Sequence, residues 1–371
     1  MLIYIIIYSL LLISGIIDGI YNLSQKQKSI IFIFWIISFT LFRGLRWETG
    51  TDWEQFYYCF QHTTWDNIFT YSRSIDREDI MEPGYMILNW VIRQLGSYTI
   101  FLIITNFFLL LSYAYFSYKI APRYSLLIFS AFFFFQNFFP IRQSLAAGIL
   151  IWAYYYMYKT NLFKFLIIVF LSFTIHKTAL ILLPFYFLSR IRFPWYIILG
   201  SYTIFLMLLS EEITKNIMIL IAGIVGDVNS ELEYLIGEYI NYNYNPSKII
   251  NDYISNFFNF FLLCIFCYCR KSITKNGDIG YLYNIFLNAF FIQSVFQRIF
   301  VNLGMGGLAR INLYFVDSYP ILLALSMIHF KTKATKLYWL CFLFLFCLYR
   351  FYNMTFHYPE IHFPYYSIFS F

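Results

Sequence analysis

Charged residues are scarce in this chain of 371 residues: 12% are Asp, Glu, Lys or Arg, whereas 60% are hydrophobic. Soluble domains carry about twice that share of charge, so the composition excludes an ordinary soluble protein. Met1–Ile20 is apolar but lacks the basic start and the small-residue cleavage site of a secretory signal. We therefore expect an all-α polytopic membrane protein whose first span is this segment.

Cysteine patterns, metal motifs and repeats are also lacking. Of the six cysteines, only Cys59 lies in a polar segment, which indicates neither a disulfide framework nor a zinc site. His357, Glu360 and His362 fit no metal-ligand spacing. No internal repeat is detectable, which argues against an inverted-repeat transporter. We expect no required cofactor, although a divalent metal would be compatible with the residues present, and no nucleic-acid partner.

The chain does contain successive apolar segments of roughly 15 to 22 residues, close to the length that crosses a bilayer. Basic residues gather in six short connections between them: Lys26/Lys28, Lys119/Arg123, Lys159/Lys164, Arg190/Arg192, Arg270/Lys271/Lys275 and Lys331/Lys333/Lys336. By the positive-inside rule, these connections face the cytoplasm of the cell. The acid-rich segments then face the opposite side of the membrane.

This topology predicts about 12 transmembrane helices in a single integral membrane domain over residues 1–371. The spans are expected near 2–21, 29–42, 98–118, 124–139, 142–158, 163–175, 177–189, 194–210, 252–269, 280–300, 309–329 and 335–350. Outer segments follow at 43–97, 211–251 and 351–371. Tyr85–Leu95 is too short to cross, so we expect this segment and Trp53–Gln61 to form helices at the membrane surface.

The segment Arg43–Tyr85 concentrates ionisable groups as no other part of the chain does. It holds Arg43, Arg46, Glu48, Asp52, Glu54, Asp79 and Glu82 together with Trp47 and Trp53. A membrane protein that gathers such side chains at one face usually handles a polar substrate there. We therefore look for the functional site in this polar loop.

Two acids of the loop stand at expected helix starts. Gly50 permits a tight turn, and Asp52 is a good N-cap for the helix that begins at Trp53. Pro83 suits a first helical position, with Glu82 as the cap before it. For each acid, a capping role and a catalytic role remain open.

Three further residues are expected at the same face. Arg142 lies in the first turn of a helix after Pro140, where a cation opposes the helix dipole. Either an acid of the loop or a phosphate should offset its charge, since arginine suits bidentate diphosphate recognition. His176 follows an apolar helix and is either a general base or a hydrogen-bonded interfacial histidine. Arg310 follows the glycine-rich Gly304–Gly307 and would form a second anion clamp.

In this order, these motifs resemble the EpsG/Wzy-like family of bacterial polysaccharide polymerases. The match consists of an Arg before GTD (Arg46, Gly50, Thr51, Asp52), EPGY (Glu82–Tyr85), PIRQ followed by Leu-Ala (Pro140–Ala146), His-Lys after an apolar helix (His176, Lys177), a late Arg (Arg310) and a looser Pro-Tyr (Pro364, Tyr365). Trp53 stands where the family commonly has tyrosine.

The resemblance implies a GT-C-like fold and polymerisation of O-antigen or capsule glycan at the periplasmic face of the bacterial inner membrane. Such enzymes transfer one undecaprenyl-diphosphate-linked oligosaccharide onto another, sometimes with a chain-length regulator as partner. Rival activities are those of an O-antigen ligase, which uses the same donor, and of a flippase for the lipid-linked sugar. A flippase would be expected to carry charges along a central path rather than at one face.

The resemblance also suggests roles for individual residues. Asp52 or His176 would be the base, and Glu82 would orient a catalytic group or bind sugar hydroxyls. Arg142 and Arg310, with Arg46, would hold the diphosphate. Aromatic side chains in the loop and after it would contact sugars: Trp47, Trp53, Tyr57 and Tyr85.

Overall fold

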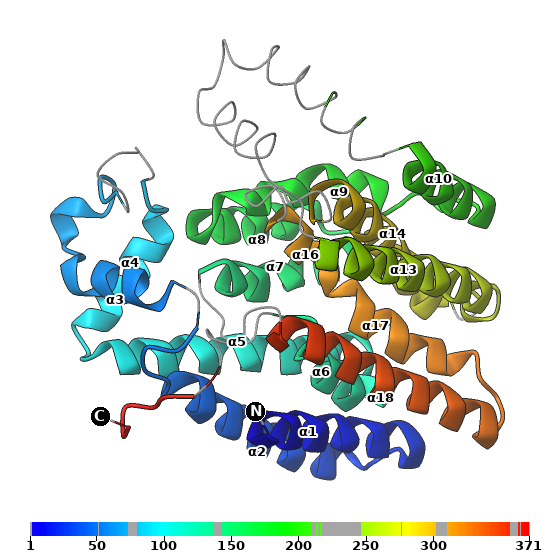
Figure 1. The fold of residues 1–371 in the computed structure, drawn as a ribbon, viewed down its shortest axis with the longest axis horizontal. Coiled ribbons are helices and arrows are strands. Elements are labelled where there is room, and N and C mark those ends of the chain that lie inside the picture. The colour runs from blue at the N-terminus through cyan, green and yellow to red at the C-terminus, as the bar shows by residue number, and fades with distance from the viewer. Residues whose placement is uncertain are drawn as a thin grey trace. The chain divides into compact units, whose positions relative to one another are not determined.

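The computed structural model describes residues 2–50, 52–72, 80–136, 142–208, 213, 216, 246–275, 277–301, 310–356, 363 and 365–370. Helices account for nearly all regular structure in this part of the chain (Figure 1). Extended backbone pairs there only at two isolated bridges, Arg46 with Ser367 and Ser72 with Ile80. The all-α prediction is confirmed.

Each of the twelve expected spans contains a helix. Those of the first half are α1 (Leu2–Tyr21), α2 (Gln25–Gly44), α5 (Tyr98–Ile120), α6 (Ser125–Phe132), α7 (Arg142–Tyr158) and α8 (Leu162–Ile175). Those of the second half are α9 (Leu182–Leu188), α10 (Trp195–Leu208), α13 (Pro246–Ile273), α14 (Gly277–Phe296), the pair α16 (Leu313–Val316) and α17 (Ser318–Leu325), and α18 (Lys333–Phe356). Within the described ranges, seven stretches are long and apolar enough to cross a membrane. The total of about 12 crossings stays a prediction.

The outward faces of these helices are apolar, as a bilayer requires. On α2, the exposed side chains include Ile30, Ile33, Phe34, Ile37 and Leu41. The middle of the opposite, buried face is apolar as well, with Phe32, Trp35, Ile36 and Phe39. A helix that is hydrophobic all round belongs inside a membrane or a large core. The chain is therefore a multi-pass membrane protein.

The helices divide into two compact units. The first comprises Met1–Leu180 and Leu323–Phe371, and the second comprises Ile181–Leu322. In the first unit, α2 packs on α5, α1 on α6, and α7 on both α5 and α8. The polar loop belongs to this unit. Most of the expected 211–251 loop lies outside the described residues, and α13 begins at Pro246, earlier than expected.

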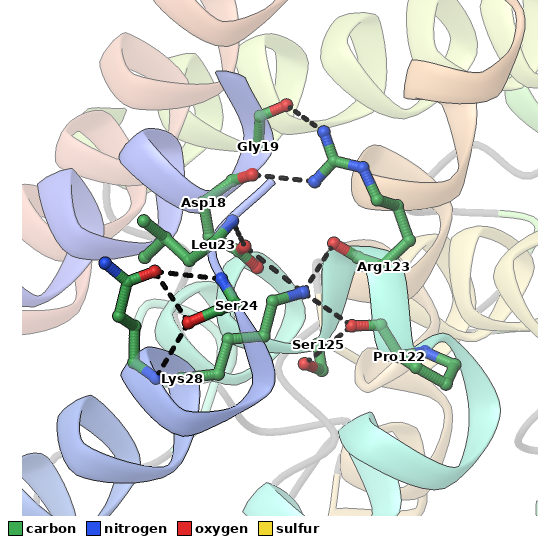
Figure 2. A network of polar contacts seen from close by, with 9 residues as sticks. Asp18, Gly19, Leu23, Ser24, Lys28, Pro122, Arg123 and Ser125 are labelled. Carbon is green, nitrogen blue, oxygen red and sulfur yellow. Dashed lines mark hydrogen bonds and ion pairs between the residues drawn. The ribbon is translucent and has the colours of Figure 1, made fainter. Parts of the chain in front are cut away.

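A network of polar contacts connects three segments of the first unit, around Asp18, Lys28 and Arg123 (Figure 2). Lys28 Nζ lies 3.2 Å from Asp18 Oδ1 and donates to the carbonyl oxygens of Pro122 and Arg123. Arg123 in turn donates to the backbone carbonyls of Asp18 and Gly19 at 2.7 and 3.0 Å. Lys28 and Arg123, two of the basic residues that predicted the orientation of the chain, therefore also join α1, α2 and the short 3-10 helix Pro122–Tyr124 that precedes α6. The sequence reading missed this role, and Asp18 with it.

Candidate functional site

Two short helices form in the polar loop close to the expected positions: α3 (Trp53–His62) and α4 (Pro83–Arg93). Each helix buries one face, and the buried residues follow one another at intervals of one, three or four positions. The buried side chains are Trp53, Phe56, Cys59 and Phe60 of α3, and Tyr85, Met86, Asn89 and Ile92 of α4. This amphipathic pattern is typical of helices that lie on an apolar surface. Their place at the membrane surface stays a prediction.

A buried carboxylate connects three distant parts of the chain. Arg142, the first residue of α7, lies with its Nη1 2.5 Å from Glu82 Oε2. The other oxygen of Glu82 accepts a hydrogen bond of 2.9 Å from the backbone N–H of Lys177. The side chains of Glu82 and Arg142 are only 10% and 6% exposed. An acid of the polar loop is therefore the anion that offsets Arg142.

Gly84 allows this contact to form. A Cβ atom on Gly84 would lie 2.3 Å from Thr174 Oγ1 and 2.7 Å from the Thr174 carbonyl oxygen, near the end of α8. No side chain fits at those distances, so α4 approaches α8 closely only with glycine here. Glu82 occupies the N-cap position of α4, but its side chain makes no capping hydrogen bond. The capping role considered for Glu82 is wrong, because its carboxylate binds Arg142 and Lys177 instead.

His176 ends α8 and precedes the residue that binds Glu82. It is 4% exposed, and its Nδ1 lies 2.7 Å from Thr178 Oγ1. The structure therefore brings together Glu82, Arg142 and the His176–Lys177 pair, which come from three separate motifs. This group is named the Glu82 cluster below.

Asp52 is placed differently. It is exposed and adopts a left-handed backbone conformation with φ of 56°, next to Gly50 with φ of 104°. Its side chain makes no capping hydrogen bond to α3, so the capping role is wrong here too. Thr51, between them, lies outside the described residues. An exposed carboxylate on this turn is accessible to a polar substrate.

The aromatic candidates contact one another. Trp53 stacks on Tyr57 at 4.9 Å between ring centroids and meets the edge of Trp47 at 4.8 Å. Tyr85 is 1% exposed and packs against Phe56. Trp47 and Tyr57 are half-buried and keep some ring surface exposed, whereas Trp53 and Tyr85 mainly support α3 and α4.

Arg46 is buried, and the C-terminal tail (residues 365–370) hydrogen-bonds to the backbone on either side of it. The backbone N–H of Trp47 donates to the Tyr366 carbonyl at 2.9 Å, and the N–H of Ile368 donates to the Leu45 carbonyl at 3.0 Å. Tyr365 adds a hydrogen bond of 2.8 Å to the Phe42 carbonyl. Burial lowers the pKa of Arg46 to about 10, so its guanidinium stays protonated at neutral pH. Sequence reasoning assigned the tail no role.

Arg310 lies in the second unit, where it is exposed and begins the short 3-10 helix Arg310–Asn312. Gly304–Gly307 and Pro140 lie outside the described residues, as do His357, Glu360 and His362. Among the residues that are described, no three His, Cys, Asp or Glu side chains form a group that could hold a metal ion. The role of Arg310 therefore stays a prediction.

The fold and the Glu82 cluster define a multi-pass membrane protein with a buried ionic site beside a polar loop. The chain belongs to the EpsG family, whose model matches residues 29–367. This is the Wzy-like polymerase family, so the resemblance seen in the sequence is confirmed. Membership indicates that the chain is a polysaccharide polymerase-type membrane protein. No curated protein and no solved structure matches the chain.

Proposed function

We propose that this protein is a glycosyltransferase that polymerises a surface glycan such as O-antigen or capsule. It would join undecaprenyl-diphosphate-linked oligosaccharide repeat units at the periplasmic face of the bacterial inner membrane. One observation carries the proposal: Glu82 binds both the Arg142 guanidinium and the Lys177 backbone, so three family motifs meet at one buried site. A GT-C-like arrangement, with α3 and α4 as surface helices of the first outer loop, belongs to this proposal.

The reaction needs a base and a stabilised leaving group. A hydroxyl oxygen of the acceptor sugar attacks the anomeric carbon of the donor sugar, and the bond from that carbon to the phosphate oxygen breaks. The lipid diphosphate leaves with the electron pair, and the hydroxyl proton passes to a base. Carboxylates and histidine supply such bases, and arginine stabilises the developing negative charge.

We assign the base to Asp52, because it is exposed whereas His176 is 4% exposed. His176 is the alternative base. Arg142, oriented by Glu82, would contact the diphosphate, since a planar guanidinium suits bidentate recognition of phosphate oxygens. Arg46 and Arg310 are the further candidates for that contact. Trp47 and Tyr57 would stack on sugar rings at the loop.

Complementation tests this function. A strain that lacks the chain would receive wild type, Asp52→Asn, Arg142→Ala or His176→Ala, with membrane levels checked, and its surface glycan would be resolved by size. A ladder with wild type that collapses to one repeat unit in Arg142→Ala supports a polymerase. Absence of all surface glycan in the strain without the chain would instead indicate a flippase or ligase.

A further inference from the structure

The C-terminal tail pairs with the first residues of the polar loop. The backbone N–H of Trp47 donates to the Tyr366 carbonyl at 2.9 Å, and the N–H of Ile368 donates to the Leu45 carbonyl at 3.0 Å. The two segments run antiparallel. The mechanism proposed above does not use this pairing, although it connects the tail directly to the segment that carries the proposed base.

Thr49 extends the contact from the tail into the loop. Its side chain is buried, and its hydroxyl oxygen accepts a hydrogen bond of 3.2 Å from the backbone N–H of Tyr366, 317 positions away. The same hydroxyl donates to the Trp47 carbonyl at 2.8 Å. A hydroxyl can accept and donate at once, so this single group joins the backbone of the tail to the backbone of the loop.

The segment that follows has an uncommon backbone conformation. Glu48 has φ of 46°, Gly50 of 104° and Asp52 of 56°. Four non-glycine residues in the described part of the chain have positive φ, and Glu48 and Asp52 are two of them. Such residues cost free energy and persist only where the surrounding structure holds them. This segment, residues 47–50 and 52, is named the Asp52 turn below.

Both ends of the Asp52 turn are held by packed groups. At its far end, the buried Trp53 begins α3 and meets the ring of Trp47 at 4.8 Å between centroids. At its near end stands the tail, which is itself anchored on α2. There, Tyr365 stacks on Phe42 with ring centroids 5.0 Å apart and donates to the Phe42 carbonyl at 2.8 Å. The tail therefore provides a fixed point for the turn.

We propose that the C-terminal tail positions the proposed base Asp52, with Thr49 as the positioning residue. The inference rests on the proposed function, because it acts through Asp52. A base must lie within hydrogen-bond reach of the acceptor hydroxyl, and a displacement of about 1 Å can lower the rate about a hundredfold. The Asp52 side chain is exposed and makes no capping hydrogen bond to α3, so the backbone of the turn determines where its carboxylate lies.

The rate of glycan transfer by purified full-length protein in detergent, at saturating undecaprenyl-diphosphate-linked repeat unit, tests this role. Thr49→Val keeps the branched shape without the hydroxyl, and Thr49→Ser keeps the hydroxyl. Thr105→Val is the matched control, since Thr105 is also buried but donates to the Phe101 carbonyl of its own helix α5 at 2.7 Å. We expect Thr49→Val to lower the rate about tenfold to a hundredfold, and the other two variants to stay within about threefold of wild type.

Hydrogen exchange in the same samples shows whether the turn has loosened. The Trp47 amide, which donates to the tail, should exchange at least about tenfold faster in Thr49→Val and at the wild-type rate in Thr49→Ser. Unchanged exchange in a folded Thr49→Val protein would overturn the inference, and so would faster exchange with a wild-type transfer rate. If Thr49→Val fails to fold, Ile368→Pro removes the N–H that donates to Leu45 and should slow transfer similarly. A wild-type rate in folded Ile368→Pro would also overturn it.

A double variant separates positioning of the base from general support of the fold. In an Asp52→Asn background, adding Thr49→Val should change the residual rate by less than about threefold, because the group that Thr49 positions is already absent. A further loss of about tenfold would show that Thr49 acts otherwise and would overturn the inference. If Asp52→Asn forms no product, the exchange data and the recovery in Thr49→Ser decide.

Failure of the proposed function looks different. Wild-type protein that forms no glycosidic bond would refute the polymerase, while hydrogen exchange would still report whether Thr49 anchors the turn. Normal transfer by a folded Thr49→Val protein would refute only the positioning role.

Discussion

The ion pair between Glu82 and Arg142 allows a structural role to be separated from a functional one. Both side chains are at most 10% exposed, and Nη1 and Oε2 lie 2.5 Å apart. Removing one partner of a buried pair leaves an uncompensated charge, which typically costs about 3–5 kcal/mol. We therefore expect Glu82→Gln and Arg142→Gln each to lower the free energy of unfolding by an amount of this order.

The double variant should behave differently. With both charges gone, Glu82→Gln/Arg142→Gln leaves two neutral amides that can hydrogen-bond to each other, and the new amide oxygen at position 82 can still accept from the Lys177 N–H. We expect it to recover most of the lost stability, with a coupling free energy of about 2 kcal/mol or more between the sites. Polymer formation should stay absent, because the cation proposed for the diphosphate has been removed.

Thermal or denaturant unfolding in detergent gives the stability terms, and size-resolved glycan from complemented cells gives the activity. A stable double variant that makes polymer of wild-type length would show that the pair only holds α4 and α7 in place. Single variants as stable as wild type would refute the burial argument itself.

Three other perturbations follow from the described contacts. Gly84→Ala should lose about 1–3 kcal/mol of stability and disrupt polymerisation, because the new Cβ has no room. The control Gly200→Ala, which has nothing within 4 Å of its Cβ, should be neutral or gain up to about 1 kcal/mol. Equal melting temperatures for the two variants would refute the close approach of α4 to α8. Lys28→Met should destabilise by about 3–5 kcal/mol through the uncompensated Asp18, while the folded fraction makes polymer of normal length; shortened polymer at normal stability would contradict this. Burial lowers the pKa of Arg46 to about 10, so wild type keeps this charge through weakly alkaline pH. In Arg46→Lys the same burial acts on a side chain with an ordinary pKa of about 10.4, so its charge is lost as pH rises. Polymerisation by purified Arg46→Lys should then fall from about pH 7 to pH 9 more steeply than that of wild type, and parallel profiles would refute the role of charge.

Local patterns were enough to predict most helices. The apolar runs and the basic connections predicted a helix at each expected span, and the short amphipathic segments predicted α3 and α4 within one or two residues. The dipole argument at Arg142 correctly demanded an anion. The argument could not identify Glu82 as that anion, since no local pattern links residues 60 positions apart. Glu82 and Arg142 meet because α4 packs against α8, and α8 packs against α7.

The residues that sequence reasoning missed depend on contacts of the same long-range kind. Asp18 stands in an apolar helix with no local sign that Lys28 and Arg123 would meet there. Arg43 was counted with the polar loop, although it belongs to the last turn of α2 and faces a cavity of the helical bundle. The two expected caps failed for different reasons. The Glu82 carboxylate binds Arg142, a stronger partner than a backbone amide. Asp52 adopts a left-handed conformation in place of the extended backbone that is usual at an N-cap.

The central claim is that this protein transfers one lipid-linked glycan onto another, with Asp52 as the base and Arg142 of the Glu82 cluster on the diphosphate. The most direct measurement adds purified protein to an undecaprenyl-diphosphate-linked repeat unit and follows the products by mass. The account predicts lipid-linked dimers and longer chains, with one free undecaprenyl diphosphate released for each bond formed, and neither product from Arg142→Ala. Wild-type protein that leaves the repeat unit unchanged, or that releases it by hydrolysis without any dimer, would contradict the account.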